Sequence, residues 1–499
     1  MALFSLDEHS RFVSQAPMPI VEIVDFDPIT GEDWVNKIVL APEIDSFKLF
    51  PKEMQILQSY SFKYSTNDVD GSFSLILHPD GMEKIPVFSN KPIFDRIKPL
   101  QIVYIYEHDK NKKKPDFVGI VNRKRFVAQS GGSLRISVTG KSVASLISRF
   151  KISLDINAMS LSKQKVTQDE INKKLTSTLE KAPRDLSLVL DTVWSFLLKM
   201  SKDYLDLATS DLEKYIDEYL GGDFFEIEDG LKFQYPLASV LNGQNTMNFW
   251  DIANGIIPPP VYEKFAYINE DGETKIKIRE SPFDCSADGS GHSSWDDLEK
   301  DKKELTPELV KDFDFEVSDD EVYTAFYTYI VGSPVSSDFA FRKSTQSSGY
   351  GDNSICVFGK KAQIYGYNPL LVSFNGYGKP EKEYSENDEN ELAELNKRMK
   401  NWYGHLDEML RGTITLATEL KKPMPMCGEI VSFLGGEFYV DAVEHSWSYG
   451  GAPETKLTVS RGGDYSGKKF KPLENVTKRY QIFKKKFEES KESDYKNCG

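Results

Sequence analysis

The segment Phe438–Gly463, FYVDAVEHSWSYGGAPETKLTVSRGG, constrains the fold of this chain more than any other. Apolar residues alternate with polar ones from Phe438 to Ala442 and again from Leu457 to Val459, which is the period of a half-buried strand. Between these runs, Tyr449–Pro453 has the composition of a turn, because glycine accepts positive φ and proline has no amide hydrogen to donate. The segment therefore predicts an antiparallel hairpin.

The N-terminal part of the chain, from about residue 18 to residue 140, is also rich in predicted strands. Each shows apolar residues at alternate positions or in short runs, with turn residues between them. The predicted strands are Ile20–Val24, Trp34–Leu40, Ser59–Tyr64, Ser72–Leu77, Leu100–Tyr106, Phe117–Phe126 and Leu134–Val138. Short strands at this spacing are typical of a small barrel or sandwich.

The tripeptide Gly140-Lys141-Ser142 follows the last of these strands and precedes an apolar helix. A strand followed by Gly-Lys-Ser invites comparison with a phosphate-binding loop. That motif needs a second glycine five residues earlier, where this chain has Arg135. The sequence therefore disfavours a nucleotide site and predicts only a strand that leads into a helix.

The middle of the chain combines helices with a second hairpin. Thr167–Glu170 is a capping box that opens a helical region extending to Tyr219. Val261–Asn269 and Thr274–Glu280 predict strands on either side of a Glu-Asp-Gly-Glu turn. Further along, we expect a strand at Val322–Val331 beside the final hairpin, a helix at Glu386–Arg411 ended by Gly412, and strands at Thr413–Ala417 and Glu429–Phe433.

Three strings resemble the baseplate hub proteins of contractile-tailed phages and related injection machines. The first is the hairpin Phe438–Gly463, and the second is IKIRESPFD at Ile276–Asp284, where an arginine and a Pro-Phe pair close a hairpin. The third and weakest is the exit from the N-terminal strands between Phe117 and Ile147. The turn Pro425–Gly428 also fits, although Cys427 stands where family members more often have proline.

The resemblance implies a mainly β fold with α insertions (α+β), built on two β-barrels similar to tail-tube subunits. The implied domains are a first barrel with a capping helix at 1–150, a helical insert at 151–258, a mixed α/β insert at 259–411, the second barrel at 412–465 and a helical arm at 466–499. Part of 312–345, within the mixed insert, is expected to join the second barrel.

The resemblance also implies an assembly role. Three copies would form a homotrimeric ring that adapts the hexameric tail tube to a trimeric spike, and the ring would form part of the channel for DNA or effectors. Nothing after Gly463 resembles a spike, so the spike should be a separate chain, and other baseplate proteins are further expected partners. The expected location is the virion tail baseplate, after assembly in the cytoplasm of a host bacterium.

The net charge of −15 agrees with passage of DNA without specific binding, because nucleic-acid affinity comes largely from cations that displace phosphate counterions. No secretory signal is expected at the N-terminus, and no segment predicts a membrane span. The four cysteines lack the close spacing of a zinc or redox site.

The sequence predicts no catalytic, cofactor-binding or metal-binding residue. No two of the six histidines lie at a metal-ligand spacing on one helix, and His445 is interpreted as structural. The acidic run Asp312–Glu321 lacks the glycine and terminal glutamate of a calcium loop and is interpreted as a solvated edge. We therefore do not expect an enzyme. The alternatives are a trimeric receptor- or carbohydrate-binding tail protein and a tail-associated cell-wall hydrolase.

The segment after Gly463 is basic and predicts a helix. Val476, Tyr480, Phe483 and Phe487 are separated by three or four residues and form a narrow apolar stripe. Because this helix follows the last predicted barrel, we expect its stripe to dock on a neighbouring protein and its removal to leave the ring intact.

Overall fold

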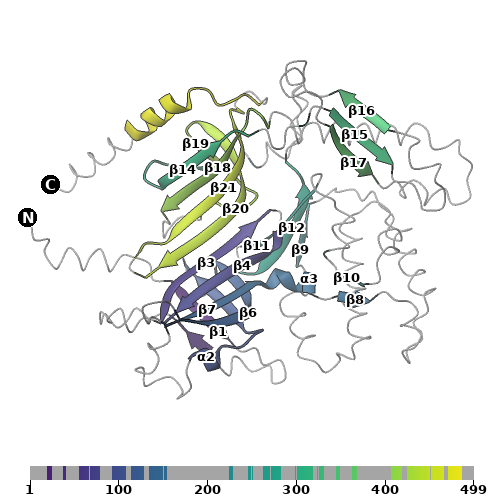
Figure 1. The fold of residues 1–499 in the computed structure, drawn as a ribbon. Helices are drawn as coiled ribbons and strands as arrows, with labels where there is room; N and C mark the ends of the chain where they lie inside the picture. Colours follow the sequence, from purple (N-terminus) through teal and green to yellow (C-terminus); the bar gives the residue numbers. More distant parts are fainter. Residues whose placement is uncertain are drawn as a thin grey trace, which may run out of the picture.

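The structure is a computed structural model, and it is built mainly from β-strands (Figure 1). The residues it describes are 19–24, 37–40, 56–66, 68–78, 93–107, 114–128, 134–149, 151–153, 224–228, 246–248, 250, 262–269, 271–282, 298, 301–318, 323, 325–330, 344–348, 362–367, 406–417, 424–449, 451–465 and 470–485. The helices predicted between residues 160 and 219 and at 386–405 lie outside this set. The prediction of a mainly β chain is confirmed.

Seven strands form the N-terminal β unit, and they pair in the order β3-β4-β7-β6-β5-β1-β2, all antiparallel. Side chains alternate on β3, where Tyr60, Phe62 and Tyr64 are buried and the intervening residues are not. The strands are β1 (Ile20–Val24), β2 (Lys37–Val39), β3 (Leu57–Ser65), β4 (Asp68–Leu77), β5 (Ile102–Tyr106), β6 (Phe117–Ala128) and β7 (Leu134–Ser142). The four-residue helix α2 (Ile93–Arg96) precedes β5.

The tripeptide Gly140-Lys141-Ser142 ends β7, as the sequence predicts. A Cβ atom on Gly140 would lie 2.0 Å from the carbonyl oxygen of Ile120, so only glycine allows β6 and β7 to approach this closely. The Ser142 hydroxyl then accepts a hydrogen bond of 3.3 Å from the amide of Ala144. It caps the short helices η3 (Val143–Ser145) and α3 (Leu146–Arg149).

The C-terminal β unit contains the hairpin predicted from Phe438–Gly463, and that prediction is confirmed. The unit's antiparallel strands pair in the order β14-β18-β21-β20, and β19 pairs with β20 and with the two-residue strand β13. These strands are β13 (Lys303–Glu304), β14 (Val310–Glu316), β18 (Leu410–Ala417), β19 (Ile430–Phe433), β20 (Gly436–Ser448) and β21 (Glu454–Gly463).

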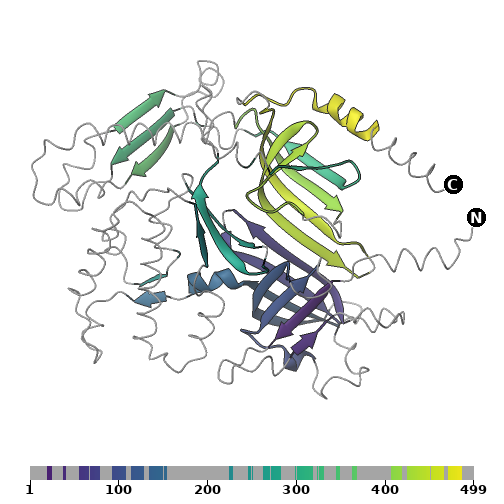
Figure 2. The ribbon, with the colours of Figure 1, turned by 180° about the vertical axis from the view of Figure 1, so that it is seen from behind.

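The two β units are joined into one 13-stranded sheet by antiparallel pairing of β3 with β20. The pairing extends from Ser59 opposite Ser448 to Ser65 opposite Ala442. Figures 1 and 2 show the purple β3 beside the yellow-green β20 from both sides. The resemblance implies two β-barrels similar to tail-tube subunits, but in the described part the strand order is open and passes continuously from one unit to the other.

Two further predictions around the C-terminal unit need correction. Leu410 and Arg411 belong to β18 and not to the end of a helix, because β14 and β21 supply ladder partners on both sides. The predicted strand at Val322–Val331 exists as β15 (Ala325–Ile330), but it does not lie beside the final hairpin. It pairs with β16 (Ser344–Ser348) and β17 (Ala362–Tyr367) in a separate three-stranded sheet. The domain boundaries stay predictions.

The second predicted hairpin is confirmed as β11 (Tyr262–Ile268) and β12 (Thr274–Glu280). Strand β9 (Phe225–Ile227) pairs with β12 in parallel, and β8 (Lys151–Ser153) pairs separately with β10 (Thr246–Asn248). In Figures 1 and 2 the hairpin crosses beside β3 and β4, which agrees with the contacts of β11.

The helix at residues 476–485 packs on its own chain. The expectation that its apolar stripe docks on a neighbouring protein is therefore wrong for these residues. The ring of Tyr480 lies 5.5 Å from that of Phe313 on β14, and the ring of Phe483 lies 5.1 Å from that of Phe433 on β19. Arg479 also donates hydrogen bonds of 3.2 Å to the carbonyl oxygens of Leu434 and Gly435. The stripe therefore covers the aromatic inner face of the C-terminal unit.

We expect the substitution Phe483→Ala to lower the free energy of unfolding by about 2 kcal/mol, because it removes a partly buried aromatic ring from this layer. The adjacent Ile482 is exposed, so Ile482→Ala should change the free energy by less than about 0.5 kcal/mol. Urea unfolding of the full chain would measure both. Equal effects of the two substitutions would contradict the packing of the helix on its own chain.

Candidate functional site

The hairpin β11–β12 is attached to the C-terminal unit through the buried side chain of Arg279. Its Nε donates a hydrogen bond of 2.9 Å to Glu263, which is on the neighbouring strand of the hairpin. Its Nη2 donates to the carbonyl oxygen of Gly428 at 2.6 Å and to the hydroxyl of Tyr439 at 3.1 Å. The arginine of the string Ile276–Asp284 thus meets the glycine before β19 and the tyrosine of the string Phe438–Val440.

Charge and burial fix the protonation of this junction, which comprises Arg279, Glu263, Tyr439 and Gly428. Burial works to lower the pKa of Arg279, but the Coulombic effect of Glu263 and Tyr439 outweighs it, and the guanidinium stays charged. Burial and Glu263 raise the pKa of Tyr439. Its hydroxyl therefore keeps its proton and donates to the carboxylate oxygens of Glu263 at 2.6 and 2.7 Å.

Gly428 is required for this approach. Its φ is +82°, in the left-handed region, and an added Cβ would lie 2.5 Å from the ring of Phe265 and 2.9 Å from Arg279 Nη2. The adjacent Cys427 is buried, and burial raises the pKa of its thiol to about 12. The junction thus holds a protonated thiol and an ion pair sealed from solvent, an arrangement that connects two β elements and offers no nucleophile.

The seam between β3 and β20 contains a second buried polar cluster. Burial and the neighbouring Glu107 raise the pKa of Tyr60, whose hydroxyl donates a hydrogen bond to Glu107. The other carboxylate oxygen of Glu107 lies 3.0 Å from Nδ1 of His445 on β20, and the His445 ring stacks on Phe62 at 4.6 Å. Glu107, which follows β5, thus links three strands across the two units.

The grouping of Thr455, His445 and Glu107 contains the residue types of a catalytic triad but not its geometry. The Thr455 hydroxyl lies 3.2 Å from Nδ1 of His445, the same nitrogen that Glu107 approaches. A triad needs the acid and the nucleophile on opposite ring nitrogens. Thr455 and Glu107 are also buried. His445 is therefore a structural histidine, as the sequence predicts.

One face of the continuous sheet is partly exposed and rich in hydroxyl groups. Successive cross-strand pairs join Ser446 to Ser61, Ser61 to Ser74, and Ser74 to Thr139. The same face has a shallow hollow of about 360 Å³ at the junction of the two units. Six of the residues that line it are Ser59, Ser61, Ser74, Ser446, Ser448 and Glu454.

Charged side chains of both signs lie near the middle of this hydroxyl-rich face. Glu444 lies opposite Lys63 on one neighbouring strand and opposite Lys456 on the other. Cross-strand neighbours point to the same side of a sheet, so Glu444 offsets part of the charge of the two lysines. The middle of the face therefore offers hydroxyl groups around one anionic and two cationic side chains.

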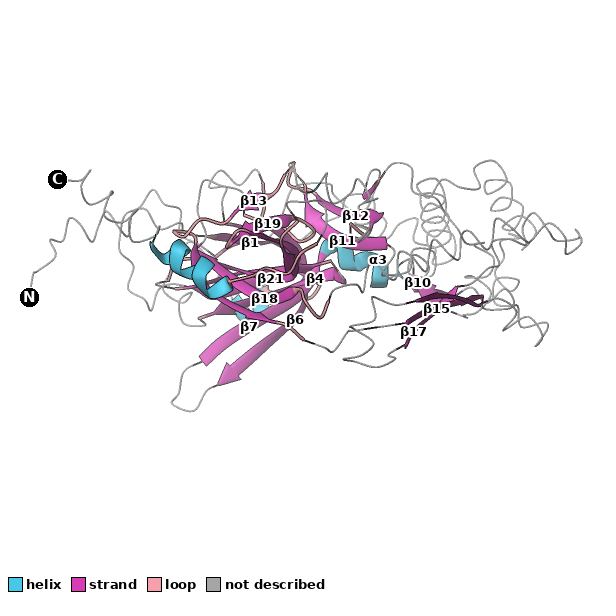
Figure 3. Ribbon diagram, turned by 90° about the horizontal axis from the view of Figure 1, so that it is seen from above, coloured by secondary structure: helices cyan, strands magenta, loops and turns pink. Residues whose placement is uncertain are grey.

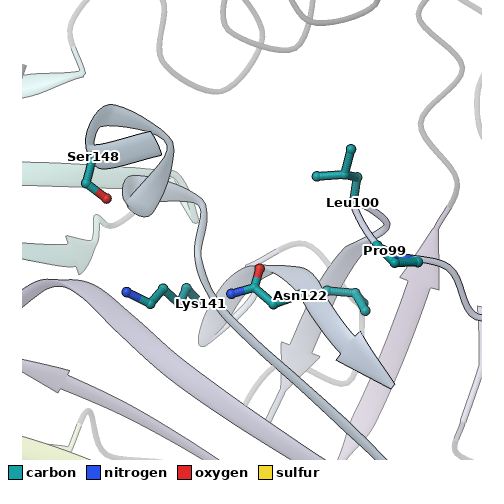
Figure 4. A pocket seen from close by; sticks show the side chains of 6 residues that line it. Pro99, Leu100, Asn122, Lys141 and Ser148 are labelled. Atoms are coloured by element: carbon teal, nitrogen blue, oxygen red, sulfur yellow. The ribbon is translucent and has the colours of Figure 1, made fainter. Parts of the chain in front are cut away.

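A second hollow, of about 300 Å³, lies where β6 and β7 meet α3 (Figure 4). Figure 4 shows Lys141 extending toward the helix that carries Ser148. Lys141 forms an ion pair with Asp70, and the Ser148 hydroxyl donates to the same carboxylate at 3.0 Å. The lysine of the Gly-Lys-Ser string is therefore held by Asp70, which is a poor arrangement for a phosphate site.

Among the residues that the structure describes, no cluster of three or more His, Cys, Asp or Glu side chains could hold a metal ion. The first part of the acidic run, Asp312–Glu316, lies on strand β14 at an end of the sheet, where the sequence predicts a solvated edge. Of the six histidines, only His78 and His445 fall in the described residues. No helix in that part of the chain is both long and apolar enough to cross a membrane.

Comparison with known proteins finds similarity at the level of structure only. No protein-family model matches the sequence, and no curated protein matches it. The chain is similar to the tail protein from Neisseria meningitidis MC58, with 10% identity over 89% of this chain and 96% of that one and a TM-score of 0.43.

Two further solved structures are similar to the chain. The 43 kDa tail protein of prophage MuSo2 from Shewanella oneidensis has 11% identity over 89% of this chain and 98% of that one, with a TM-score of 0.41. The E. coli c3393 protein has 7% identity over 84% of this chain and 77% of that one, with a TM-score of 0.35. It is a component of the type VI secretion system and has structural similarity to T4 bacteriophage tail proteins gp27 and gp5.

We expect Arg279→Met to lower the free energy of unfolding by about 3–5 kcal/mol, because it leaves the Glu263 carboxylate buried without its counter-charge. Lys277→Met is the matched control. It removes a cation two residues away on the same strand, whose ion pair with Glu226 is exposed, so the loss should stay below about 1 kcal/mol. Urea unfolding of the full chain measures both, and similar losses would contradict the role given to the buried junction.

Proposed function

We propose that this chain is a structural subunit of the hub in a contractile tail or a related injection machine. The observation that supports the proposal most is the presence of two β units in one chain, joined edge to edge by β3 and β20. The resemblance of Phe438–Gly463 and Ile276–Asp284 to hub proteins adds to it, since residues of both strings meet at Arg279.

Two joined β units give the chain a way to reconcile different symmetries. Three copies in a closed ring would present six similar β units on one side, suited to a hexameric tail tube, and a three-fold arrangement on the other, suited to a trimeric spike. The spike would be a separate chain, and other baseplate proteins would surround the ring. In this proposal the protein acts in the tail baseplate, and its role is mechanical and not catalytic.

The hydroxyl-rich face is suited to the wall of a channel. Tight phosphate binding needs clustered lysine and arginine side chains, whereas in the middle of this face Glu444 lies between Lys63 and Lys456, with serine and threonine around them. DNA could move along such a wall without specific binding. The ring would hold the spike until contraction and would then provide part of the open passage.

We expect the purified full chain to form a particle of about 170 kDa in light scattering, three times the 56.7 kDa of one chain. Negative-stain images should show a ring of six lobes around an opening. A single chain with no ring in the images, combined with binding on a glycan array or activity on a peptidoglycan zymogram, would favour one of the two alternatives and reject the hub.

A further inference from the structure

Two strands of the continuous sheet, β14 at one end and β6 in its N-terminal half, have a segment without a partner strand on one side in the described chain. Strand β14 pairs with β18 and with no other strand in the described chain. Strand β6 pairs with β5 only through residues 117–120, so residues 122–128 have a strand partner only in β7. Figure 3 shows β6 and β7 extending together beyond the rest of the molecule. Such edges expose backbone N–H and C=O groups that can pair with another chain.

The two edges carry opposite charges at matching positions. On β6, Arg123 and Arg125 are exposed two residues apart, and on β14, Asp312 and Asp314 are exposed two residues apart. No ion pair is formed by any of these four side chains within the described residues. Among the described residues of one copy, the basic edge and the acidic edge are therefore both left without an ion-pair partner.

All four charges lie on the hydroxyl-rich face. Arg123 lies opposite Thr139, which belongs to that face, and Asp312 lies opposite Thr415. Thr415 in turn lies opposite Lys456, which is paired with Glu444 on the same face. Cross-strand neighbours share a face, so the arginines on β6 and the aspartates on β14 point to the same side of one sheet.

The exposed apolar side chains gather near the same two strand edges, on β6 and β14. Five large apolar side chains are exposed in the described part of the chain: Leu100, Phe126, Val317, Tyr480 and Ile482. Phe126 is on the part of β6 that has a partner strand only in β7. The amide of Leu100 donates a hydrogen bond of 2.8 Å to the carbonyl oxygen of Val121, next to that part. Val317 follows β14, and the helix carrying Tyr480 and Ile482 contacts that strand through Phe313. Exposed apolar groups beside polar ones are typical of contact surfaces.

From these observations we infer that residues 122–128 of one copy pair antiparallel with β14 of a second copy of this chain. Arg123 then faces Asp314 and Arg125 faces Asp312 across the new strand pair. This inference deepens the proposed ring by naming the two surfaces that meet within it.

The strand directions agree with such a contact. The path β14-β18-β21-β20-β3-β4-β7-β6 contains eight strands, and every neighbouring pair is antiparallel. Because the number of strands is even, β14 and β6 run in opposite directions within one copy. Rotation about an axis along the strands keeps the direction of every strand. Strand β6 of one copy is therefore also antiparallel to β14 of the next copy. The contact joins two different surfaces head to tail, and such contacts form a ring when the rotation between copies closes.

Charges on edge strands can also serve only to prevent pairing with other chains. A protective role would be served equally well by the same sign at both ends, and it would not be accompanied by exposed Leu100, Phe126 and Val317. The complementary signs and the apolar neighbours at both edges therefore favour a contact between copies over protection.

Charge exchange at the two edges tests the inference. We expect R123E/R125E and D312R/D314R each to sediment as a single chain at concentrations where the unmodified chain is assembled, because like charges then meet. The fourfold exchange R123E/R125E/D312R/D314R should restore assembly. K275E/K277E, an equal charge change at the same spacing on β12, should assemble normally. Thermal unfolding of each variant should match that of the unmodified chain when both are diluted to single chains, since all four edge positions are exposed.

A mixture of R123E/R125E with D312R/D314R gives a further test. One variant then has two acidic edges and the other has two basic edges, so favourable contacts form only between unlike variants. The two variants would have to alternate around a ring, and a ring of three copies cannot alternate. Two-chain species should therefore replace three-chain rings. Three-chain rings in the mixture, or unchanged assembly of the separate variants, would overturn the edge contact while leaving a hub ring intact. If the unmodified chain instead forms an assembly other than three copies and the exchanges break it, the edge contact stands and the proposed three-copy hub fails.

Discussion

The pairing of β3 with β20 is the constraint on which the rest of the structure depends. These strands come from opposite ends of the chain, so forming the pair closes a long loop and must be compensated by many contacts. Seven residue pairs in the ladder, the Glu107–His445 contact and the buried ring of Phe62 supply them. Without this seam each unit would expose a central edge, and the exposed face would not be continuous.

Local features of the sequence were sufficient to predict some elements. The hairpins at Phe438–Gly463 and Val261–Glu280 could be predicted because alternation and turn residues act over a few positions. Alternation on β3 shows that Tyr60 and Phe62 share a buried face, but it does not name the strand that pairs with it. The pairing of β3 with β20, which makes one sheet of the two units in the described residues, therefore could not be predicted.

Burial that depends on distant segments could not be predicted. In the string Ile276–Asp284 the apolar positions are Ile276 and Ile278, which places Arg279 on the opposite, outward face of the hairpin. It is buried because the C-terminal unit covers that face through Gly428 and Tyr439. The helix at 476–485 is a similar case, since its partner is the phenylalanine face of β14, whose other face carries aspartates.

Hydrogen exchange of the backbone amides in β3 and β20 tests the central claim most directly. If these strands pair with each other, peptides covering residues 59–65 and 442–448 should exchange as slowly as those from the central strands β4 and β7, because a ladder on both sides protects them. Rapid exchange in both peptides, at the rate of the edge strand β2, would show that the two β units are separate and would contradict the continuous sheet.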